Sequence, residues 1–232
     1  MKRKLLSLIA VMAAAAACFT GCLDSGKSSS GASTASEETT AAESFTNDEG
    51  EELSESMELM YVKFRDVPAL ESGPVLKLSD TTAKPGDIAE VTVSVTGAAD
   101  QWSMCGIHIT YPDVLECQLD DPVELYAKYE PGEAVKKNAG FVAMDWEDNL
   151  APEMIREHNK SLFFTTMFMD DKGGDGDIAT FYFKVPDDAQ PGTVYKLSYY
   201  YMDSDMFRNS ETDMSFEKYA FEHLQDGSIT IR

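Results

Sequence analysis

Two stretches of this chain, residues 78–96 and 181–198, combine alternating apolar and polar residues with a Pro-Gly turn. Alternation with a period of two puts the apolar side chains of a strand on one face and the polar ones on the other. Pro85-Gly86 and Pro191-Gly192 interrupt the two runs at positions typical of turns between strands. Such a chain cannot bury its apolar side chains as a bundle of helices, so the pattern predicts half-buried strands packed in layers.

The rest of the C-terminal region repeats this pattern. Apolar side chains alternate through residues 89–95, 179–185 and 229–231, and convincing helical periodicity is rare. About 160 residues are enough for one domain with a proper core. We therefore predict an all-β fold, a β-sandwich.

The N-terminus carries the features of an exported protein. Lys2, Arg3 and Lys4 precede an uncharged run, residues 5–17, that is too short to cross a bilayer. Phe19-Thr20-Gly21-Cys22 resembles the lipobox of bacterial lipoproteins, although a second site ending at Cys18 competes with it and plain secretion is the alternative. We predict that residues 1–22 are a lipoprotein signal peptide and that Cys22 carries lipid. Two acyl chains anchor a protein stably, so we expect the chain on the outer face of the cell membrane.

Composition divides the remaining chain. Residues 23–56 are acidic and rich in Ser, Thr and Ala, so they bury too little apolar surface to fold and are predicted to be a disordered linker. Residues 57–74 are apolar enough to form a short ordered lead-in, as a helix or an extra strand. The predicted domain occupies residues 75–232.

Charge and cysteine content exclude some partners. The chain has 41 acidic and 19 basic residues and a formal charge of −22, which repels nucleic acid and anionic lipid heads. Cys105 and Cys117 lie in apolar runs, so we interpret them as buried thiols rather than as a disulfide.

No motif indicates catalysis or a bound cofactor. The three histidines are scattered, and neither a nucleophile elbow nor a phosphate-binding loop is present. Asp145, Glu147 and Asp148 around Trp146 are read as the end of a strand rather than as a glycosidase pair. Residues 170–177 are rich in Asp and Gly but do not fit the EF-hand spacing, so an acidic turn is predicted. We expect neither enzyme activity nor a metal site.

The turns and strands together resemble a known family. They lie in a fixed order at residues 75–78, 84–87 (Lys-Pro-Gly-Asp), 91–95, 107–115, 176–185, 188–193 and 226–231. This order is similar to that of the cohesin domain of cellulosome scaffold proteins. The resemblance implies a jelly-roll-like sandwich of about nine strands that binds dockerin-bearing proteins, either polysaccharide-degrading enzymes or scaffold subunits. It also implies that calcium belongs to the dockerin and not to this chain.

The resemblance points to one face of the sandwich. If Cys105, Ile107 and Ile109 turn inward, their neighbours turn outward. The outward set expected on this strand is Met104, Gly106, His108 and Thr110. In cohesins this face receives the dockerin helices, and type I members often have Asn and Asp where Met104 and Gly106 stand here. By the same resemblance we assign to the face Ala143, Asp145, Met167, Met169 and part of residues 199–202.

An alternative function remains open at this point. Carbohydrate-binding modules resemble cohesins in fold and stack exposed aromatic rings on sugars, so polysaccharide is a possible partner. The candidates are Trp102, Trp146 and the tyrosines at 199–201, although alternation sends neighbouring tyrosines to opposite faces. A purely structural role in the cell envelope is a third possibility.

Overall fold

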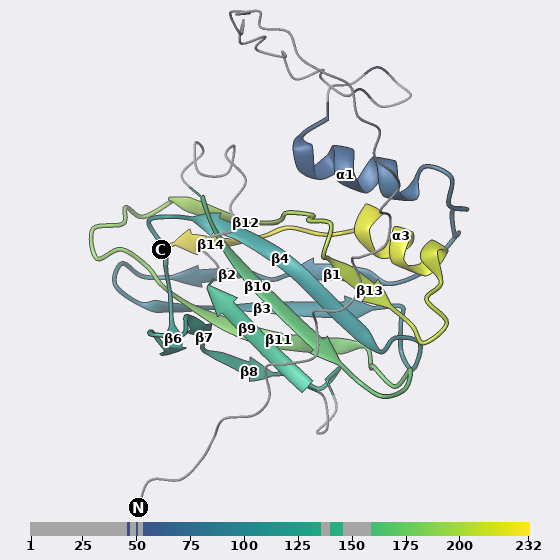
Figure 1. Cartoon of the computed structure of the whole chain (residues 1–232). Coiled ribbons are helices and arrows are strands. Elements are labelled where there is room, and N and C mark those ends of the chain that lie inside the picture. The colour runs from purple at the N-terminus through teal and green to yellow at the C-terminus, as the bar shows by residue number, and fades with distance from the viewer. Residues whose placement is uncertain (1–45, 47–49, 51–52, 136–139, 146–158) are drawn as a thin grey trace, which may run out of the picture. The chain divides into compact units, whose positions relative to one another are not determined.

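The computed structural model describes residues 46, 50, 53–135, 140–145 and 159–232 (Figure 1). The predictions for the signal peptide, for Cys22 and for most of the linker lie outside these residues. Trp146, Glu147 and Asp148 lie outside them as well.

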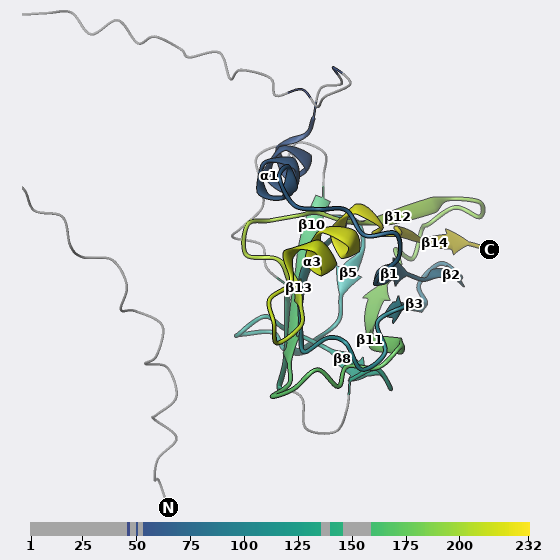
Figure 2. The ribbon, with the colours of Figure 1, turned by 90° about the vertical axis from the view of Figure 1, so that its right-hand side faces the viewer.

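Two sheets face each other (Figures 1 and 2). The first sheet contains, in order, β1 (Val75–Leu78), β3 (Ile88–Thr96), β11 (Gly176–Lys184) and β5 (Glu116–Cys117), with β8 (Tyr129–Pro131) also paired to β11. The second contains β2 (Asp80–Ala83), β14 (Gly227–Ile231), β12 (Val194–Tyr199), β4 (Met104–Pro112), β10 (Asn159–Met167), β9 (Gly140–Asp145), β7 (Tyr126–Ala127) and β6 (Leu119–Asp121), with β13 (Met206–Arg208) paired to β4. The predicted β-sandwich is confirmed.

The described residues form more strands than the nine expected, namely five in the first sheet and nine in the second. The additional ones are short pieces such as β5, β6, β7, β8 and β13, which span two or three residues each. Alternation cannot be recognised over so few residues, so the sequence could not reveal them.

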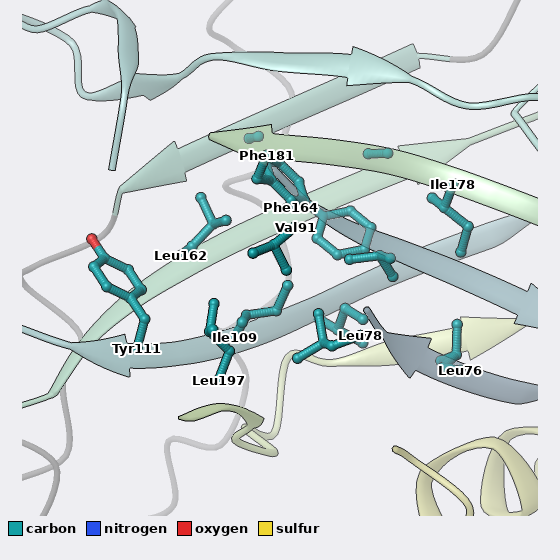
Figure 3. Packing of buried hydrophobic residues seen from close by; sticks show 14 of the residues in the cluster. Leu76, Leu78, Val91, Ile109, Tyr111, Leu162, Phe164, Ile178, Phe181 and Leu197 are labelled. Carbon is teal, nitrogen blue, oxygen red and sulfur yellow. The ribbon is translucent and has the colours of Figure 1, made fainter. Parts of the chain in front are cut away.

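The core lies between the sheets and follows the predicted alternation. Val91 and Phe181 of the first sheet and Ile109 and Phe164 of the second are all buried (Figure 3). Val93, Val95 and Phe183 continue the buried rows. Because the inward positions are filled from both sheets, apolar burial drives the two layers together.

Two helices accompany the sandwich. The lead-in forms a helix and not an extra strand: helix α1 spans Glu55–Phe64. It begins at Ser54, whose side chain accepts a hydrogen bond from the Met57 amide. Helix α3 (Met214–Glu222) was not expected; Asp213 caps it by accepting from the Ser215 amide at 2.9 Å. Helix α3 lies beside β13 (Figure 2), and the ring of Phe216 in the helix stacks on that of Phe207 in the strand. In the described part of the chain, no helix combines the length and the hydropathy that crossing a membrane requires.

Both cysteines of the domain are free and buried, which confirms the interpretation as thiols. Cys105 turns into the core from β4, and Cys117 does so from β5. Burial raises the pKa of each thiol far above its ordinary value. Both therefore stay protonated and pack as small apolar side chains.

Candidate partner-binding face

Strands β4, β10 and β9 pair side by side and turn alternate residues away from the core. Cross-strand neighbours form three rows: Met104 faces Met167 and then Gly140, Gly106 faces Thr165 and then Val142, and His108 faces Phe163 and then Met144. Directly opposed residues lie on the same face of a sheet. We call this surface the outer face; its positions are Met104, Gly106, His108, Thr110, Ser161, Phe163, Thr165, Met167, Gly140, Val142 and Met144.

One half of the outer face is open to solvent. Met167 is 53% exposed and Val142 is 42% exposed, while Met104, Phe163 and Met144 are half-buried. Met104 and Met167 thus point outward as expected, and their role in binding stays a prediction. Met169, just beyond the end of β10, is fully exposed.

The orientation expected for Ala143 and Asp145 is wrong. Both turn into the core and are buried, and the outward residues of β9 are Val142 and Met144. The Asp145 carboxylate accepts a hydrogen bond from the buried Tyr111 hydroxyl, which compensates for its loss of water. In the sequence of β9 each face carries apolar residues, so alternation by itself could not choose between the two phases.

His108 and Thr110 do point to the outer side of β4, but they are covered, which corrects the expectation that they are exposed. His108 is only 2% exposed, and its Nδ1 lies 2.6 Å from Oδ1 of Asp205. The Thr110 hydroxyl donates to the carbonyl of Ser198 at 3.2 Å. Burial raises the pKa of the Asp205 carboxyl above its ordinary value, and the contact with His108 partly opposes that rise.

Gly106 is also covered. A Cβ built on it would lie 3.2 Å from Thr165 Oγ1 and 3.6 Å from Met206 Cγ. Met206 belongs to β13, in which it pairs with Gly106 while Arg208 pairs with Met104. Strand β13 could not be predicted from the sequence, since a strand of three residues has no recognisable period.

Burial on its inward side holds β13 in place. The Phe207 side chain is fully buried, with its ring centroid 5.3 Å from that of Trp102 and 5.6 Å from that of Phe216. On the other side, Arg208 Nε donates to Glu217 Oε2 at 2.8 Å. Glu217 is fully buried in α3, and its second oxygen accepts from Lys63 Nζ of α1 at 2.8 Å. One carboxylate therefore ties β13 and both helices together.

Three of the aromatic candidates for sugar binding, Trp102, Tyr199 and Tyr201, pack into the domain instead of forming an exposed platform. Trp102 is 0% exposed, with its Nε1 donating to the Gly174 carbonyl at 3.0 Å. Tyr201 is buried against Phe64 and Phe221, and Tyr199 packs against the core. Assigning Trp102 and Tyr201 to a carbohydrate surface is therefore wrong.

The acidic loop at residues 170–177 holds neighbouring loops in place. Asp175 accepts hydrogen bonds from the amides of Gly97 and Ala98, at 3.1 and 2.8 Å. Asp171 accepts from the amide of Ser210 at 2.6 Å. Within the described ranges, no group of three or more His, Cys, Asp or Glu side chains is placed to hold a metal ion.

The outer face differs in charge from the rest of the molecule. None of its positions is Asp, Glu, Lys or Arg, although 26% of the residues of the chain are charged. Its open half consists of methionine, valine, phenylalanine and threonine side chains. An exposed apolar patch of this kind marks an interaction surface rather than a reaction centre.

Comparison with known proteins agrees with this architecture. Residues 74–209 match the family model described as Cohesin domain. The structure is similar to a type III cohesin module from the cell-surface anchoring scaffoldin ScaE of Ruminococcus flavefaciens. The TM-score is 0.56 at 23% identity, and the match covers 70% of this chain and 89% of that one.

Two further solved structures are similar at lower scores. A non-cellulosomal cohesin from the archaeon Archaeoglobus fulgidus has a TM-score of 0.49 at 16% identity, covering 69% of this chain and 92% of that one. The sixth cohesin of scaffoldin B from Acetivibrio cellulolyticus, solved in complex with a dockerin, has a TM-score of 0.48 at 17% identity, covering 69% and 100%. None of the curated proteins matches the chain.

Proposed function

This chain belongs to the cohesin family, since the family model covers more than half of its length, and from that premise we propose that it captures dockerin-bearing proteins through its outer face. A cohesin module is a non-catalytic binding domain. The solved cohesins of Acetivibrio cellulolyticus and Clostridium thermocellum that resemble this fold were obtained in complex with dockerins. The expected partners are polysaccharide-degrading enzymes or other scaffold subunits.

The observation that carries this proposal is the uncharged, half-open outer face of β4, β10 and β9. Met104, Val142 and Met167 present apolar side chains there without competing charges. Recognition would proceed by packing of side chains and exclusion of water, without chemistry. A stable complex should bury about 800 Å² on each partner.

We further propose that the domain is held at the cell surface by lipid on Cys22. If residues 23–54 behave as a flexible coil, the tether has an end-to-end distance of about 30 Å. A single domain on such a tether anchors one partner at a time. An anchoring role is also the one named for the similar scaffoldin of Ruminococcus flavefaciens.

A pull-down tests partner capture. The chain lacking residues 1–22 is immobilised and offered dockerin-containing proteins of the same organism, once with calcium and once with a chelator. We expect calcium-dependent capture of a dockerin, with the calcium held by the dockerin. Retention on insoluble polysaccharide without capture of any dockerin would instead support a carbohydrate-binding function.

The anchor needs a separate experiment in the native cell. Cys22→Ala should release the protein from the membrane into the medium, while Cys18→Ala should leave it membrane-bound. The reverse result would assign the lipid to Cys18, and membrane binding by both variants would contradict lipidation as the anchor.

A further inference from the structure

We infer that the partner-binding surface extends beyond β4, β10 and β9 to β13 at one margin and β7 at the other, and that it accommodates dockerin helices with uncharged, aliphatic contact faces. This inference rests on the proposed function, because it concerns the partner of the same face. It adds Met206 and Tyr126 as residues that determine which partners bind.

The margin at β13 continues the open half of the outer face. Met206 pairs with Gly106, and that row continues through Thr165 to Val142. Because Gly106 lacks a side chain, the Met206 side chain can lie over it, with its Cγ 3.6 Å from where a Cβ would stand. A partner seated on Met104 and Val142 therefore also meets Met206.

The margin at β7 continues the neighbouring row. Tyr126 pairs with Met144, which faces Phe163 of β10. Tyr126 is 43% exposed, and the Leu125 carbonyl beside it accepts a hydrogen bond from the Asp145 amide at 2.9 Å. This backbone bond keeps the tyrosine in line with the sheet, so its ring adds to the same surface.

Both margins are fixed before any partner arrives. The Ser103 amide donates to the Arg208 carbonyl at 2.9 Å, and buried Phe207 prevents β13 from swinging outward. A surface whose contact residues are already ordered loses less entropy on binding. Met206 therefore belongs to a preformed surface and not to a flap that closes over the partner.

The chemistry of the surface determines the residues of the partner. Within the described parts of these five strands, the outward positions carry one charged side chain, Arg208, and its Nε is already bonded to Glu217. Methionines at 104, 144, 167 and 206 are flexible and polarizable, which suits packing against Leu, Ile, Val or Met side chains. A partner helix that presents acidic or basic residues at the contact would lose their hydration without gaining a counterion.

Binding measurements on single-residue variants test this extension. The chain lacking residues 1–22 is titrated by calorimetry against individually purified dockerin modules of the same organism. The variants are Met206→Asp, Tyr126→Asp, Met167→Asp and, as the matched control, Ile88→Asp, since Ile88 is an exposed apolar residue on the other sheet. We expect each of the first three variants to raise Kd about tenfold or more and the control to bind like the parent. The Kd of the parent should change little between low and high salt.

Two outcomes separate the inference from the proposed function. If Met167→Asp weakens binding while Met206→Asp and Tyr126→Asp bind like the control, the face is narrow and the extension is wrong. If the parent binds none of the modules, the proposed function fails and the extension fails with it. Circular dichroism monitors folding, and Met206→Gln replaces Met206→Asp if the charged variant unfolds.

Discussion

Nδ1 of His108 lies 2.6 Å from Oδ1 of Asp205, and both side chains are almost fully buried although they are 97 positions apart in the sequence. The second carboxylate oxygen of Asp205 accepts from the Met202 amide at 3.0 Å. This pair fastens the turn before β13 onto the outer side of β4. It explains why one half of the outer face is closed and the other half is open.

Removing Asp205 should therefore destabilise the domain. In Asp205→Ala, buried His108 and the Met202 amide both lose a partner, which should lower the free energy of unfolding by about 1–3 kcal/mol. Urea denaturation measures this loss. Asp203→Ala is the control, because Asp203 is exposed in the same turn. It should change the free energy of unfolding by at most about 0.5 kcal/mol. Equal effects of the two substitutions would contradict a structural role for the pair of His108 and Asp205.

Stability should depend on pH through the same carboxyl group. Burial raises the pKa of Asp205 above its ordinary value of 3.8, against the opposing effect of His108. A group with a raised pKa in the folded state contributes stability below its unfolded pKa and loses that contribution as pH rises through the folded pKa. The unfolding free energy of the parent minus that of Asp205→Asn should therefore fall as pH rises above about 4, and a difference that grows with pH would refute this assignment.

The stability of the domain should depend on Glu217, which links β13 to the two helices. Glu217→Ala leaves Lys63 and Arg208 without their shared carboxylate and should cost about 3–5 kcal/mol. The control is Glu222→Ala on the same helix, a residue that lies 3.8 Å from Lys218 and is partly exposed, for which about 0.5 kcal/mol is expected. Thermal and urea unfolding measure both changes. A loss no larger than that of the control would show that packing alone holds α3.

Adding a side chain at Gly173 should destabilise the domain. A Cβ at this position would lie 2.1 Å from Cε2 of buried Trp102, so Gly173→Ala should displace the indole and cost about 1–3 kcal/mol. Gly140→Ala is the matched control in β9, because no atom lies within 4 Å of its added Cβ. The tryptophan fluorescence spectrum should shift in the first variant alone, and an unshifted spectrum with unchanged stability would argue against tight packing here.

The main architecture could be predicted from sequence because period-two alternation is a local property. Val91, Val93 and Val95 in one strand, and Cys105, Ile107 and Ile109 in another, identified inward faces that the structure confirms. The same alternation identified Met104 as outward-facing, whereas Met167 was assigned to the face by the resemblance to cohesins. Phe163 and Thr165 share the phase of Met167, so alternation counted from that residue could also have identified them.

The sandwich, its buried rows and the outward phase of β4 thus follow from the sequence, since they depend on which residues avoid water. Which outward residues stay exposed follows from the tertiary structure instead, because segments remote in sequence cover some of them. The turn at Asp205 covers His108, and Met206 of β13 covers Gly106. Asp145 is buried in the core, where it accepts a hydrogen bond from the Tyr111 hydroxyl. Alternation separates the two sides of a strand, but it carries no information about what packs on either side.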